Sequence, residues 1–162
     1  MSHRLRILTL ILLVLGATTA LAGPKKDAPA EAGPATLADP TAVLDDIQQG
    51  WMDQDADLIL KHFGPSKVTI SIDGSGPGGS YSRDQGYFVF KELFKATVTR
   101  KFTFVQIRKS NADGSGTFAI AERRYQRRDD GRQVKDKVYI SLHLEGEQNS
   151  GRWVLDEIKS IR

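Results

Sequence analysis

One helix, with its own start signal and only strand-like sequence after it, constrains the fold of this chain most strongly. Ser82 and Gln85 have the Ser-x-x-Gln spacing of a capping box, in which two side chains satisfy backbone N–H groups at the start of a helix. One face of this helix is expected to be apolar and comprises Gly86, Phe90, Leu93, Phe94 and Thr97. Phe88 falls on the opposite, polar side, where the pattern does not explain it.

The chain after this helix is predicted to form four strands. They lie at about residues 100–109, 115–127, 133–145 and 151–161, and turn sequences rich in Gly, Asp and Asn separate them. Consecutive strands joined by short turns form an antiparallel meander.

Two helices and a strand are predicted before the capped helix. Asp39-Pro40 begins a first helix, in which Val43, Ile47 and Trp51 form one stripe. The run Asp53-Gln54-Asp55 caps a short second helix over residues 56–63, and residues 67–72 alternate as a half-buried strand.

The register of the hairpin at residues 115–145 decides which side chains face the helices. We prefer a three-residue loop, Asp129-Asp130-Gly131 with Gly131 at positive φ, over a two-residue loop, because it pairs apolar residues with each other. The preferred pairs are Phe118 with Leu142, Ile120 with Ile140, Glu122 with Val138, and Arg124 with Asp136. Glu122 and Arg124 would then face the helices. They would be explained either structurally, by an internal pair such as Arg124 with Asp136 or by Glu122 at the solvated rim, or functionally, as the polar floor of a pocket.

The N-terminus indicates export. Residues 1–22 combine two arginines, an apolar run and Ala20-Leu21-Ala22, which is the pattern of a cleaved signal peptide; the apolar run is too short for a membrane anchor. Residues 23–38 resemble a flexible linker, and residues 39–162 form one domain. We therefore expect a secreted or periplasmic protein that leaves the membrane after cleavage.

Charge and motifs exclude several function classes. The formal net charge is +3, and loss of Arg4 and Arg6 leaves about +1, so we expect no nucleic-acid binding. The string Gly74 to Gly79 matches G-x-G-x-x-G, but no helix opens directly on it, so it predicts a loop and no dinucleotide. His62 and His143 have no second ligand at metal-binding spacing, so we expect neither metal nor cofactor.

The element order resembles the nuclear-transport-factor-2-like, or SnoaL-like, superfamily. The resemblance spans about residues 39–162 and rests on the run Trp51 to Asp57, on Leu60 to Phe63, on Tyr81 to Gln85, on Phe90 to Phe94 and on Gly151 to Leu155. It is closest to an uncharacterised branch of secreted bacterial domains. It implies an α+β cone-like fold, with a curved, mostly antiparallel sheet wrapped around N-terminal helices.

The resemblance names no activity, because the shared motifs are mainly structural. It implies that an enzyme of this superfamily would use Asp, Tyr or His placed inside the cone. We expect a non-catalytic domain that binds a small amphipathic ligand or a protein partner through its cone or sheet, with the candidate ligand-binding residues Tyr81, Tyr87, Gln106, Glu122 and Arg124. The alternative is a small isomerase, dehydratase or hydrolase that uses Glu122 as its acid or base. A third hypothesis is a homodimer formed through the sheet face of Tyr125, Tyr139 and His143.

Overall fold

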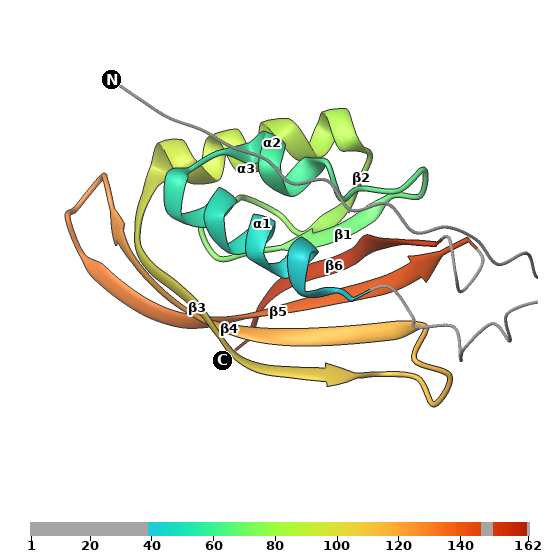
Figure 1. Ribbon diagram of the computed structural model, residues 1–162. Coiled ribbons are helices and arrows are strands. Elements are labelled where there is room, and N and C mark those ends of the chain that lie inside the picture. The colour runs from blue at the N-terminus through green and yellow to red at the C-terminus, as the bar shows by residue number, and fades with distance from the viewer. Residues whose placement is uncertain (1–38, 147–150, 162) are drawn as a thin grey trace, which may run out of the picture. The chain divides into compact units, whose positions relative to one another are not determined.

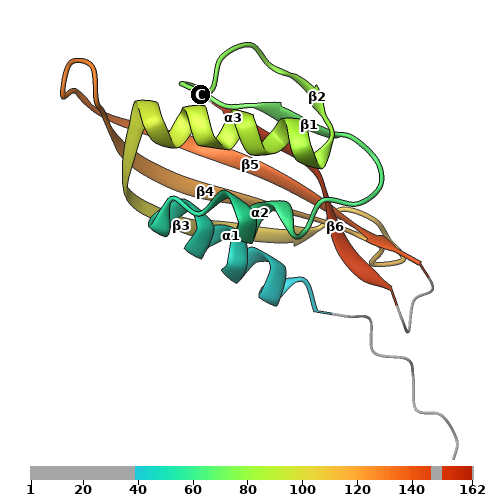
Figure 2. The ribbon, with the colours of Figure 1, turned by 90° about the horizontal axis from the view of Figure 1, so that it is seen from above.

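The computed structural model describes residues 39–146 and 151–161; the predicted signal peptide and linker lie outside them. Three helices, α1 (Thr41–Asp53), α2 (Ala56–Leu60) and α3 (Arg83–Ala96), lie on one face of a curved sheet (Figures 1 and 2). The six strands of the described part of the chain are β1 (Val68–Ser71), β2 (Gly79–Tyr81), β3 (Thr97–Lys109), β4 (Gly116–Arg127), β5 (Gln133–Glu145) and β6 (Arg152–Ile161). None of the helices in the described ranges is long and apolar enough to span a membrane.

The sheet is mixed, with the strand order β2-β1-β6-β5-β4-β3. Strands β3 to β6 form the predicted antiparallel meander, and β1 joins it parallel to β6. The sequence did not predict the short strand β2, which pairs with β1 across the glycine-rich loop. The mostly antiparallel α+β architecture predicted from the sequence is confirmed.

The helix signals are confirmed with small changes in length. Ser82 accepts a hydrogen bond from the Gln85 backbone, and the Gln85 side chain accepts one from the Ser82 backbone, which completes the capping box. The second helix ends at Leu60 and not at Phe63, because the His62 carbonyl accepts from the Leu155 amide and Phe63 bridges to β6. A contact with the sheet therefore ends this helix.

The predicted register of the β4–β5 hairpin is wrong. Phe118 lies opposite Ser141, Ile120 opposite Tyr139, Glu122 opposite Lys137, and Arg124 opposite Lys135. Gly131 does adopt a positive φ of 69°, but the loop is longer, since the Arg127 amide donates to the Arg132 carbonyl. The inward residues of β4 are instead Ala119, Ala121, Arg123 and Tyr125.

The volume of the core explains this register. Large aromatic side chains from α1, α3 and β3 already fill the space above the middle of the sheet. Because protein interiors are close-packed, the part of β4 beneath these aromatic side chains has room for little more than methyl groups. Ala119 and Ala121 fit there, and both are fully buried, whereas Phe118 stacks on Tyr139 on the outer face.

Candidate functional site

The interior of the cone is filled by an aromatic cluster. Trp51 of α1 stacks on Phe102 of β3, with ring centroids 4.8 Å apart, and meets Phe90 and Phe94 of α3 edge-on at 6.2 Å and 6.0 Å. Trp51 and Phe90 are fully buried. A ligand site has to lie outside this cluster.

One charged pair is buried beside the cluster. Arg123 of β4 has no solvent exposure, and it donates through Nε and Nη2 to the two carboxylate oxygens of Asp136 at 2.9 Å and 2.5 Å. Its guanidinium carbon lies 5.0 Å from the centre of the Trp51 ring and 4.1 Å from that of Tyr125. Nη2 also donates to the Asp73 carbonyl at 3.2 Å.

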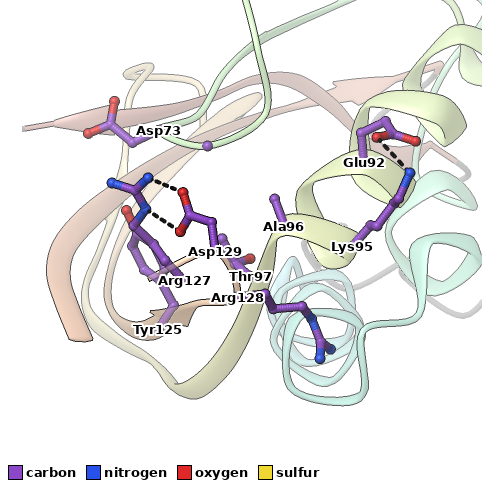
Figure 3. A pocket seen from close by; sticks show the side chains of 10 residues that line it. Asp73, Glu92, Lys95, Ala96, Thr97, Tyr125, Arg127, Arg128 and Asp129 are labelled. Atoms are coloured by element: carbon purple, nitrogen blue, oxygen red, sulfur yellow. Dashed lines mark hydrogen bonds and ion pairs between the residues drawn. The ribbon is translucent and has the colours of Figure 1, made fainter. Parts of the chain in front are cut away.

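A groove of about 770 Å³ opens at the end of the cone next to this pair. Figure 3 shows the groove between the C-terminal turn of α3, which carries Glu92, Lys95 and Ala96, and the β4–β5 hairpin. Tyr125 and Thr97 also line it, with Asp73 and Gly74 from the loop after β1. Three segments distant in sequence therefore build one hollow.

The charges around the groove differ in how far they are paired. Arg127 bonds to Asp129, and its other terminal nitrogen lies 3.7 Å from Asp130. In contrast, the Asp73 carboxylate has no hydrogen bond or ion pair with any residue in the described part of the chain. Arg128 forms no ion pair with a described residue either, and its side chain makes one hydrogen bond among them, a long one of 3.5 Å to Gln54 Oε1. One carboxylate and one guanidinium thus remain available to a ligand.

Tyr125 adds an uncharged polar group. Burial raises the pKa of its hydroxyl, and so it is neutral at physiological pH. Among residues 39–146 and 151–161 this hydroxyl has no hydrogen-bond partner. Tyr125 can therefore donate or accept a hydrogen bond and can also contribute its ring to apolar contact.

Glu122 and Arg124 do not face the cone. Both alternate with the buried Arg123, so their side chains project from the outer face of the sheet, and Lys135 Nζ approaches Glu122 to 3.5 Å. The expectation that they form a polar pocket floor is therefore wrong. Glu122 also does not lie inside the cone, where an acid or base of the catalytic alternative would have to be. The internal pair exists, but it joins Asp136 to Arg123 in place of Arg124.

The other three predicted residues are not brought together. Tyr81 donates to the Pro77 carbonyl at 2.7 Å and lines a shallow hollow with the exposed Phe88. Tyr87 lines another hollow, where Lys91 Nζ lies 5.6 Å from its ring centre. Gln106 lies on the edge strand β3 opposite the outward-facing Ile120. The five candidates thus lie at separate surface positions and form no common site.

Both histidines of the described domain are engaged by carboxylates. His62 Nε2 lies 2.9 Å from Asp46, which also binds Lys61, and burial lowers the pKa of His62 although Asp46 opposes this. Burial would raise the pKa of Asp46, but hydrogen bonds from Lys61 and His62 lower it overall. His143 Nδ1 lies 2.6 Å from Asp156 on the outer face. The described residues contain no group of three His, Asp or Glu side chains arranged to hold a metal ion.

The site residues predicted from the sequence do not include those that build the groove. The predicted register turns Arg123 and Tyr125 to the outer face, and no sequence pattern singles out Asp73. One sequence signal does point to the groove floor: Ala119, Ala121, Arg123 and Tyr125 alternate along one strand, and alanines can face a core that is already filled by large side chains.

Comparison with known proteins identifies the fold. No protein-family model and no curated protein matches the sequence. A DUF4783 family protein from Bacteroides ovatus is 15% identical, with a TM-score of 0.53, and the match covers 71% of this chain and 90% of that one. A ketosteroid isomerase-like protein from Erwinia carotovora atroseptica is 12% identical, with a TM-score of 0.57 and coverage of 75% and 93%.

Further solved structures agree. A protein from Catenulispora acidiphila with a ketosteroid isomerase-like fold, solved in complex with trimethylamine, is 10% identical, with a TM-score of 0.56 and coverage of 74% and 84%. Designed NTF2-like proteins also match. At these identities the likeness concerns the fold and not the activity. The chain has the α+β cone fold of the nuclear-transport-factor-2-like, or SnoaL-like, superfamily, as its sequence predicts.

Proposed function

We propose that this protein is an exported, non-catalytic domain that binds a small amphipathic ligand in the groove at Tyr125. The observation that carries the proposal is the groove itself, which has a volume of about 770 Å³ and combines an aromatic floor with unpaired polar groups. Pockets for small ligands are typically of this size and hold a few polar groups that orient the ligand.

The walls suggest how such a ligand lies. Its apolar part contacts the Tyr125 ring, Ala96 and Gly74, and its polar groups meet Asp73 on one side and Arg128 on the other. A ligand with separated positive and negative groups complements this arrangement better than a simple anion, because acidic and basic side chains both surround the groove.

A binding role is preferred to catalysis because the interior, where the superfamily's enzymes place their acids and bases, holds aromatic side chains and a neutralised ion pair. Glu122, the carboxylate that the catalytic alternative requires inside the cone, lies on the outer face.

The first test is native mass spectrometry of protein purified from its exported compartment, which should reveal a retained small molecule. The same sample tests export, since cleavage after Ala22 would leave Gly23 as the first residue. An uncleaved N-terminus would contradict export.

The second test blocks the groove. Ala96 is exposed on α3, so Ala96→Trp fills the groove with little cost to folding, and Ala112→Trp places the same side chain in the exposed turn after β3. We expect Ala96→Trp to abolish binding of the amphipathic probe 1-anilinonaphthalene-8-sulfonate and retention of the ligand, and Ala112→Trp to preserve both. Equal binding by the two variants would place the ligand elsewhere.

A further inference from the structure

Arg123 is placed in the core at a cost in stability. Taking a charge pair out of water is expensive, and apolar side chains of similar size are often at least as stable in its place. Nη1 of Arg123 also has no hydrogen-bond partner among the described residues, although it is fully buried. Its contribution to stability therefore does not account for an arginine at this position.

The contacts of Arg123 explain better why an arginine occupies this position, because two of them are made with residues that line the groove. Its guanidinium stacks on the ring of Tyr125, which is the floor, and Nη2 donates to the carbonyl of Asp73, which is the back wall. Asp136 holds the guanidinium in the orientation that makes both contacts possible.

A second link runs from the same pair to the same loop. The Ser160 hydroxyl donates to Asp136 Oδ2 at 3.2 Å and accepts the Asp73 backbone N–H at 3.0 Å. Both backbone polar groups of Asp73 are therefore fixed, its N–H through Ser160 and its carbonyl through Arg123. Gly74 follows with a φ of 95°, so the chain turns immediately after this anchor.

We propose that the Arg123–Asp136 pair is a positioning device for the groove, which holds Tyr125 and the loop of Asp73 in the geometry that binds the ligand. This inference rests on the proposed function for its purpose, but its structural part can be tested without a ligand. Arg123 acts through Tyr125 and Asp73, and Ser160 belongs to the same device.

The test replaces the pair by apolar side chains of similar size, in the double variant Arg123→Met/Asp136→Leu. We expect its melting temperature to stay close to that of the parent, while the Gly74 and Tyr125 amide resonances shift. Hydrogen exchange at the Asp73 amide should become about tenfold faster, and affinity for 1-anilinonaphthalene-8-sulfonate should fall about tenfold, the effect of losing one hydrogen bond of ordinary strength. Arg123→Lys, which keeps the charge but not both bonds, should lie in between.

The matched control is Arg152→Met/Glu145→Leu, which changes an exposed Arg–carboxylate pair on β5 and β6 and should alter none of these readouts. If the buried double variant is unfolded, Ser160→Ala removes only the anchor of the Asp73 amide and should still accelerate its exchange.

Two results separate this inference from the proposed function. Unchanged exchange at Asp73 and unchanged probe affinity in a folded double variant would overturn the positioning role. Failure of the parent protein to bind any probe, with faster Asp73 exchange in the variants, would reject ligand binding while supporting the positioning of the loop.

Discussion

Replacement of Trp51 tests whether the protein's own side chains fill the cone. Trp51 is fully buried and meets three aromatic rings as well as the Arg123 guanidinium. Trp51→Ala should therefore lower the free energy of unfolding by about 3–5 kcal/mol, the usual cost of removing a large buried aromatic ring. Since small domains have about 5–15 kcal/mol in total, the variant should remain folded at low temperature and contain a cavity.

Trp51→Phe should cost much less. The indole Nε1 has no partner within the described residues, and burying an unsatisfied donor costs about 1–3 kcal/mol, so its removal offsets part of the lost packing. Urea denaturation followed by circular dichroism gives both values. Phe88→Ala is the control, because Phe88 is 64% exposed and should change stability by less than about 0.5 kcal/mol.

Indole provides the decisive measurement. If Trp51→Ala leaves an indole-shaped cavity, free indole at about a hundredfold excess over its Kd should restore about 2.7 kcal/mol, with no effect on the parent protein. A loss below about 1 kcal/mol in Trp51→Ala, or a folded variant that indole does not stabilise, would refute the description of a cone filled around Trp51.

Three further predictions concern the rest of the domain. Ser82→Ala removes half of the capping box and should cost about 1 kcal/mol in urea denaturation; no loss would contradict its role at the start of α3. Burial lowers the pKa of His62 below 6.5 against the opposing effect of Asp46, so its contribution to stability is present above pH 6.5 and is lost as the pH falls through the lowered pKa. The urea midpoint of His62→Gln should therefore depend less on pH across this window than that of the parent protein. If both midpoints depend on pH equally, groups other than His62 cause the pH dependence. Homodimerisation through the outer sheet face stays a prediction; Tyr139 and His143 lie on that face, Phe118 joins them, and Tyr125 faces inward instead. Light scattering should show a dimer that Phe118→Asp dissociates, and a monomeric parent at high concentration would contradict it.

The elements of the fold could be predicted because their signals are local. A capping box acts over four residues, and the stripe of apolar side chains on α3 needs no knowledge of the partner surface. Both were predicted and are observed in the structure. The short strand β2 was missed because a run of Gly, Ser and Tyr becomes a strand only through its pairing with β1. The end of α2 was misplaced for the same reason, since a contact with β6 determines it.

The candidate site depended on one register, and counting buried charges could have selected the observed one. The predicted register turns Glu122, Arg124 and Asp136 toward the helices, which leaves one carboxylate in the core without a cation. The observed register turns only Arg123 and Asp136 inward and buries a neutral pair. Because an unpaired buried charge costs far more than an exposed Phe118 or Ile120, charge neutrality should have outweighed the pairing of apolar residues. The same reasoning places Tyr125 beneath the groove, because inward-facing residues alternate along the strand and Tyr125 follows Arg123 by two positions.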